Sequence, residues 1–200
     1  MLTPNWEQEP PSAEEVEQMW RELQIQPIPF QHPALDQLLE SLQATHINGG
    51  AEFAMFQVSD NPVLRWFVSR NRVDEITFFD QFLTVPAVIN ALPSLDIQNP
   101  LASPLDLTGN SSAFTFDGEL ARVLVQGGAY EHFKGTAGEA KAIGVRFCDA
   151  LFGDRYDEIQ MYSCNNAWSD WFGNVAWDMT WFGIDKRNQY IWLLCVTDMD

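Results

Sequence analysis

Two aspartates near the C-terminus, Asp178 and Asp198, are the residues of this chain that most directly suggest catalysis. They lie in two apolar, aromatic-rich runs, 175–184 and 190–198, which are typical of one β-hairpin. With a three-residue loop between the runs, Asp178 lies opposite Val196 and Asp198 is its diagonal neighbour, roughly 7–8 Å away. Two carboxylates at that distance can act as acid and base or bind a hard cation. The alternative is a solvated sheet end, and another register would separate the pair.

A small hydrolase or transferase could use this pair, helped by Asp170 or His132, in a tryptophan-lined cleft. The sequence gives catalysis no further support. It lacks the HExxH, GxSxG, GxGxxG and P-loop patterns, and its histidines stand apart from one another. We therefore expect no metal site and no cofactor, and we favour a binding function over an enzymatic one.

The polar stretch 163–173 is the loop that most resembles a binding site. It mixes amides, a carboxylate and two indole rings, the chemistry of a recognition surface in which aromatic side chains anchor a partner and polar groups orient it. The alternative is that the tryptophans cover the edge of the core while the Asn and Asp residues form turns. The predicted binding residues are Asn165, Asn166, Trp168, Asp170 and Trp171.

Five of the eight tryptophans fall within residues 168–192. Each indole ring is a large apolar group with one N–H that needs a hydrogen-bond partner when it is buried. Because residues near the hairpin turn are apolar on both strand faces, we expect a central strand pair that is covered on both sides. Trp177, Trp181 and Trp192 are therefore predicted to lie in the core.

The expected hairpin loop is 186–188, with Asn188 in the left-handed conformation that such loops need. This loop pairs Trp181 with Leu193 and Phe182 with Trp192. Elsewhere, capping-box spacings predict helices over 12–23 and 137–152. We also expect a helix around residues 35–42, one at about 118–126 capped by Asp117, a short one over 86–92, and strands over 53–58 and 63–69, while 73–83 suits either a helix or a strand.

These elements predict an α+β fold, a mainly antiparallel sheet with a C-terminal Trp-rich hairpin at about 175–198 and amphipathic helices packed on one face. Two hundred residues suit a single globular domain, 1–200. The Pro-, Ser- and Asn-rich stretch 94–112 could instead join two lobes, about 1–93 and 113–200. The pattern gives neither the strand order nor the oligomeric state.

The chain is strongly acidic, with 28 acids against 11 bases and a formal net charge of −17. The excess is largest in the first and last fifty residues. Such a charge repels nucleic acid and membrane surfaces and attracts basic proteins, although it could also serve solubility alone. We therefore expect a non-enzymatic binding or regulatory module that engages a basic protein partner through an acidic, Trp-containing surface.

Three cysteines without CxxC spacing are typical of reduced core residues, which favours a reducing compartment. The N-terminal residues lack the basic and apolar regions of a signal peptide. No apolar run reaches the length of a membrane span. The expected location is the cytoplasm.

Overall fold

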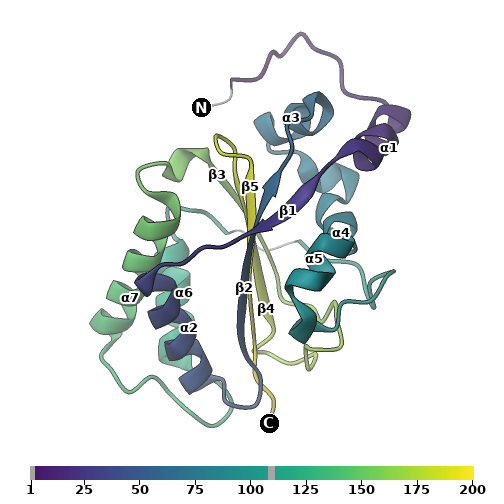
Figure 1. Cartoon of the computed structure of the whole chain (residues 1–200). Coiled ribbons are helices and arrows are strands. Elements are labelled where there is room, and N and C mark those ends of the chain that lie inside the picture. The colour runs from purple at the N-terminus through teal and green to yellow at the C-terminus, as the bar shows by residue number, and fades with distance from the viewer. Residues whose placement is uncertain (1–2, 108–110) are drawn as a thin grey trace.

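The computed structural model describes residues 3–107 and 111–200. Its centre is a five-stranded antiparallel sheet with the strand order β1-β2-β5-β4-β3. Seen edge-on in Figure 1, the sheet stands between two layers of helices. The predicted α+β class with a Trp-rich C-terminal hairpin is confirmed, but the helices cover both faces of the sheet instead of one. The strands are β1 (Ile25–Ile28), β2 (Gly50–Val58), β3 (Ile159–Cys164), β4 (Met179–Asp185) and β5 (Tyr190–Thr197).

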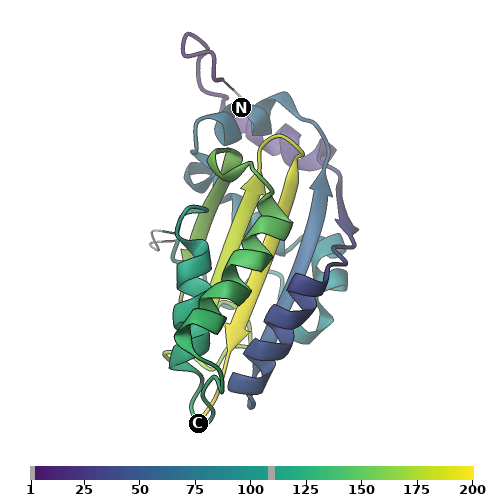
Figure 2. The same ribbon diagram turned by 90° about the vertical axis from the view of Figure 1, so that its left-hand side faces the viewer.

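The helices divide between the two faces of the sheet (Figures 1 and 2). One face carries α1 (Ala13–Glu22), α3 (Pro62–Ser69), α4 (Phe78–Leu83) and α5 (Pro86–Ala91); the other carries α2 (Pro33–Thr45), α6 (Phe116–Gln126) and α7 (Ala137–Phe152). Short 3-10 turns lie at Val73–Ile76, Pro93–Leu95 and Tyr156–Glu158. Among the described residues, no helix is both long enough and apolar enough to cross a lipid bilayer.

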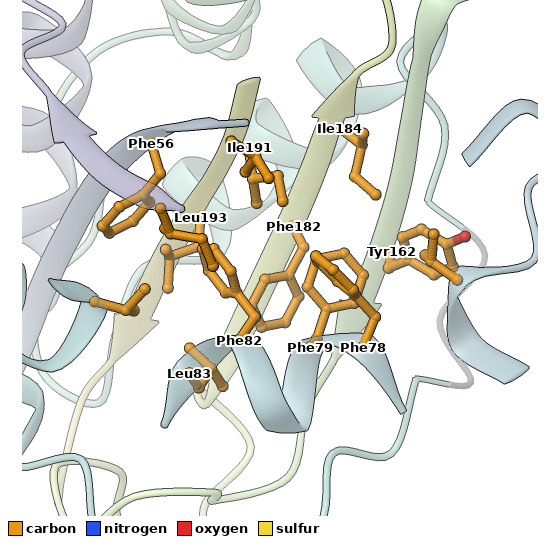
Figure 3. Packing of buried hydrophobic residues seen from close by; sticks show 14 of the residues in the cluster. Phe56, Phe78, Phe79, Phe82, Leu83, Tyr162, Phe182, Ile184, Ile191 and Leu193 are labelled. Carbon is orange, nitrogen blue, oxygen red and sulfur yellow. The ribbon is translucent and has the colours of Figure 1, made fainter. Parts of the chain in front are cut away.

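Each face of the sheet has its own apolar core. Towards α4, the aromatic rings of Phe56, Phe79 and Phe82 surround Phe182 and Leu193 (Figure 3). The opposite core, towards α6 and α7, is built around tryptophan rings and includes Phe116, Phe147, Trp181, Trp192 and Leu194. Because side chains alternate along a strand, β4 and β5 supply residues to both cores, and the predicted double covering of the hairpin is confirmed.

The hairpin register differs from the prediction by one residue. Trp181 pairs with Leu194, and Phe182 pairs with Leu193. The loop has four residues, 186–189, and the left-handed residue is Gln189 (φ 57°), not Asn188. As side chains alternate with a period of two, this shift moves every side chain of β5 to the other face relative to β4.

The side chain of Asp185 explains the longer loop. Its Oδ1 accepts hydrogen bonds from the backbone N–H groups of Arg187 (3.1 Å) and Asn188 (3.0 Å). Its Oδ2 is 3.1 Å from the guanidinium of Arg155. A buried aspartate before a turn stabilises it by accepting successive N–H groups of the turn residues. The spacing of the two strands in the sequence does not reveal this stabilisation.

The predicted strand 63–69 is instead helix α3. Asn61 caps it by accepting the N–H groups of Val63 (2.9 Å) and Leu64 (3.3 Å), and Pro62 occupies the first turn. Proline at that position favours a helix start, and this local signal outweighs the β propensity of the apolar residues that follow. The ambiguous region that follows is helical as well, in the 3-10 turn Val73–Ile76 and in α4.

Both predicted capping boxes are confirmed, Ser12 with Glu15 at α1 and Thr136 with Glu139 at α7. The expected cap of α6 is wrong. That helix begins after Thr115, without a side-chain cap, and Asp117 lies inside its first turn, where its Oδ2 is 2.7 Å from the ammonium of Lys141.

The stretch 94–112 is described except for residues 108–110. After the 3-10 turn Pro93–Leu95, its described residues form neither helix nor strand. Strands that precede this stretch (β1 and β2) and strands that follow it (β3, β4 and β5) share one sheet, because β2 pairs with β5.

Candidate functional site

The predicted binding loop holds another segment of the same chain. The Oδ1 atom of Asn166 accepts the N–H of Asp106 (2.9 Å), and its Nδ2 donates to the carbonyl oxygen of Pro104 (2.9 Å). The amide of Gln98 donates to the carboxylate of Asp170. Asn165 is exposed. The polar groups of this loop therefore form hydrogen bonds that hold the segment 98–106 in place, and this role is structural.

The two tryptophans of that loop differ in exposure. Trp168 is fully buried, and its Nε1–H donates to the hydroxyl of Thr180 at 2.9 Å. Trp171 is half-buried and packs edge-on against Phe172. Trp177, expected in the core, is half-buried and precedes β4. The large indole that the sequence assigned to a binding edge thus belongs to the core.

Asp178 closes the turn that leads into β4. Its side chain is fully buried. It accepts hydrogen bonds from the N–H groups of Gly173 (3.3 Å) and Val175 (3.0 Å) and from the hydroxyl of Thr197 (2.5 Å). A carboxylate with three internal donors is fixed in place, and it ties residues 173–178 to the end of β5.

Asp198 also ties separate segments of the chain together, the residues before β2 and the α6–α7 connection. It is also fully buried, and it accepts the N–H groups of Asn48 (2.8 Å) and Ala129 (2.7 Å). Within residues 3–107 and 111–200, it shares no hydrogen-bond partner with Asp178. The observed register places Met179, not Asp178, opposite Val196. By strand alternation, the two carboxylates therefore project from opposite faces of the sheet.

The other residues of the catalytic alternative lie apart. His132 is exposed on the α6–α7 connection, where its Nδ1 is 3.1 Å from the carbonyl oxygen of Gln126. The neighbouring Phe133 packs on the α6/α7 core, whereas Trp168, beside Asp170, packs on the opposite core. The assignment of these residues as catalytic stays a prediction, and the geometry adds no support to it.

All three cysteines are buried and unpaired. Burial raises the pKa of the Cys164 thiol to about 12 and also raises the pKa values of the Cys148 and Cys195 thiols. A protonated buried thiol is a poor nucleophile at neutral pH. In the described parts of the chain, no three His, Cys, Asp or Glu side chains gather closely enough to hold a metal ion.

A surface around α1 combines exposed carboxylates with an exposed indole. Trp6 is 76% exposed, the most exposed large apolar side chain among the described residues. The exposed Glu7 and Glu9 follow it in the sequence, and α1 carries the exposed Glu14 and Glu17. We call these five residues the acidic α1 surface. Trp6 is not among the predicted binding residues, although its place directly before an acidic residue is a signal that the sequence offers.

Trp6 is already in contact with a cation. The guanidinium carbon of Arg70 lies 5.6 Å from the centroid of the Trp6 ring and 4.2 Å from that of Trp66. Arg70 also donates a hydrogen bond to the carbonyl oxygen of Asn5. An aromatic face attracts a guanidinium at this range, so the contact with Arg70 helps to hold the Trp6 indole in place.

A hollow of about 440 Å³ adjoins the acidic α1 surface between α1 and the 3-10 turn Val73–Ile76. Its walls are apolar at Val16, Phe67 and Ile76, and Glu17 and Glu75 supply carboxylates at the wall. Arg72 also lines the hollow and pairs with Glu75, so Glu17 is the carboxylate that a partner's cation would meet. Long cationic side chains suit such a place, because their methylene stems cover apolar surface while the charged end meets a carboxylate.

The sequence of this chain matches no protein-family model, and the search of curated proteins also found no match.

Proposed function

We propose that this protein is a non-enzymatic binding or regulatory module that engages a basic protein partner through the acidic α1 surface. The observation that carries the proposal is the 76% exposure of the Trp6 indole beside carboxylates. Interfaces are anchored by tryptophan, and complementary charge speeds encounter with the right partner. The anchor role that the sequence gave to Trp168 passes to Trp6, since Trp168 is buried.

The charge balance of the surface supports this proposal. Glu7, Glu9 and Glu14 are exposed, and none of them forms an ion pair within the described residues. Glu17 is 3.1 Å from Arg21, in an exposed pair that a competing cation can replace at little cost. A protein of net charge −17 also attracts cations over a distance comparable to the Debye length.

The proposal includes a cytoplasmic location, for which the three unpaired, buried cysteines are the support. A partner in that compartment would present arginine-rich or lysine-rich segments to the acidic α1 surface. Arginine fits better than lysine, because its planar guanidinium stacks on indole and also pairs with carboxylate.

The test measures fluorescence anisotropy of a labelled arginine-rich peptide titrated with the protein. We expect binding at low ionic strength that weakens steeply with salt, and none for a peptide with glutamine in place of arginine. Combining Glu7→Gln, Glu9→Gln and Glu14→Gln should weaken binding about tenfold, because each exposed charge pair contributes about 0.2–1 kcal/mol. Trp6→Ala should weaken it further.

Matched controls carry the same changes elsewhere. Asp36→Asn, Glu40→Gln and Asp154→Asn together remove three exposed acids outside the acidic α1 surface, and Phe114→Ala removes another exposed ring, 68% exposed. These variants should bind nearly as the wild type does. If the control triple variant loses as much affinity as the α1 variant, net charge alone drives binding and the proposed surface is wrong. Absence of wild-type binding at low salt would also overturn the proposal.

A further inference from the structure

A second candidate site lies at the other end of the sheet from Asp178 and Asp198, where β4 turns into β5 below α3 (Figure 1). The cavity there encloses about 100 Å³. Residues from three separate parts of the chain line it: the segment from the end of β2 into α3, Phe78 of α4, and the β4–β5 hairpin. It is distinct from the acidic α1 surface, so an inference about it does not rest on the proposed function.

The floor of the cavity is apolar. Val58, Leu64, Val68, Ile184 and Ile191 all line it, and each is at most 9% exposed. Filling this space with an aliphatic group removes apolar surface from water, which stabilises the bound state by about 25 cal/mol per Å².

The rim carries three cations: Arg65, Lys186 and Arg187. Two of them are held by carboxylates. Arg65 pairs with Asp60. Arg187 donates from its Nε to Glu158 at 2.7 Å, a contact that lowers the pKa of the Glu158 carboxyl to about 2.

Lys186 differs from its two neighbours. Its Nζ donates to the Oδ1 atom of Asn71, a neutral acceptor. No carboxylate of residues 3–107 or 111–200 forms an ion pair with it. The side chain is partly buried, and this burial lowers the pKa of its ammonium group, outweighing the charges of Asp157 and Glu158, which raise it. An incompletely solvated ammonium beside an apolar cavity gains more from an anion than a solvated one does.

We propose that this cavity binds a small carboxylate with a short aliphatic tail, whose carboxylate pairs with Lys186 while the tail lies on the apolar floor. At roughly 30 Å³ for each water-sized group, the space accommodates about three such groups, as in the tail of butyrate. Asp60 engages Arg65 and Glu158 engages Arg187, so both arginines of the rim are already paired and Lys186 determines the charge preference.

The experiment is a titration of the ¹⁵N-labelled protein with sodium butyrate, followed by NMR at constant ionic strength. Butyramide, which has the same shape without the charge, is the comparison ligand. We expect shifts at 58–68 and 184–191, and at least tenfold weaker binding of butyramide. Lys186→Met, which keeps most of the stem, should reduce butyrate affinity to that of butyramide. Lys134→Met, at an exposed lysine outside the cavity, should change neither affinity.

Three results would overturn the inference. The first is wild-type protein that binds butyrate and butyramide equally, which needs no variant and is decisive even if Lys186→Met does not fold. The second is unchanged butyrate affinity in a folded Lys186→Met protein. The third is the absence of chemical-shift changes at the cavity residues up to the highest butyrate concentration of the titration.

Discussion

The indole of Trp192 occupies the space that a side chain at Gly183 would need. The two residues are direct partners across β4 and β5. A Cβ atom added to Gly183 would lie 2.1 Å from the Cε2 atom of Trp192. The indole also stacks with Phe116, at 5.6 Å between ring centroids. The glycine thus lets a large ring lie across the neighbouring strand, in the centre of the α6/α7 core.

Replacing this glycine is expected to destabilise the protein. Gly183→Ala forces the Trp192 ring out of its position, and overpacking of a core costs about 1–3 kcal/mol. Urea denaturation monitored by circular dichroism measures the free energy of unfolding. Gly138→Ala is the matched control, because a Cβ there meets only the Thr136 hydroxyl at 3.8 Å and alanine favours the helix. Equal stability of the Gly183→Ala protein and the wild type would contradict this account of the pair.

Asp178 is expected to contribute to stability. Asp178→Ala leaves the N–H groups of Gly173 and Val175 and the hydroxyl of Thr197 without their acceptor, which should cost about 2–4 kcal/mol. Asp154→Ala, at an exposed acid, should change stability by less than about 0.5 kcal/mol. Removal of a catalytic residue often increases the free energy of unfolding, because it relieves strain in the active site. A gain in stability on Asp178→Ala would therefore revive the catalytic hypothesis.

His46 is expected to make stability depend on pH. Burial lowers the pKa of its imidazole, and this outweighs the hydrogen bond to the Leu42 carbonyl and the charge of Asp198, which both raise it. Nδ1 is 3.1 Å from that carbonyl oxygen and 2.9 Å from the hydroxyl of Thr45. The unfolded chain binds a proton below about pH 6.5, before the folded protein does.

Stability should consequently fall as the pH drops below about 6.5 and level off, for this group, below the lowered folded pKa. Thermal unfolding between pH 7.5 and 5 measures the effect, and His46→Gln removes the titrating group. The slope of melting temperature against pH should be smaller in the variant. His132→Gln, at an exposed histidine, is the control and should keep the wild-type slope. A wild-type slope in the His46→Gln protein would show that other groups determine this pH dependence.

Local signals predicted several elements of the fold correctly. The capping boxes at Ser12 and Thr136 identified α1 and α7, because such a box depends only on residues three positions apart. The apolar runs around Trp181 and Trp192 identified the hairpin and its central place. These features are encoded in neighbouring residues.

Features that depend on distant contacts were not predicted. The four-residue hairpin loop depends on Asp185, whose carboxylate also meets Arg155 from outside the hairpin. The residues of strand β1, which include Pro27, show no strand pattern of their own. They form a strand because they pair with β2, from which helix α2 separates them in the sequence. Strand β3, likewise not predicted, is an edge strand that pairs with β4.

The site was harder to predict than the fold, since exposure depends on the whole molecule. Trp168 and Trp6 both stand among polar residues in the sequence. Trp168 is buried because Thr180 on β4 supplies a partner for its N–H, whereas Trp6 precedes the first helix and stays exposed. The cavity beside Lys186 joins α3 to the hairpin, residues that lie more than a hundred positions apart.

The pairing of β2 with β5 has a consequence for synthesis on the ribosome. Residues 50–57 find their partners at 190–197, so the sheet cannot close until residue 197 has been made. Until then the apolar side chains of β2, Phe56 among them, have only part of their native cover. Contacts this distant in sequence slow folding and expose a nascent chain to aggregation. A cell that makes this protein must therefore protect the nascent chain until β5 has been made, and termination before β5 removes the central strand of the sheet.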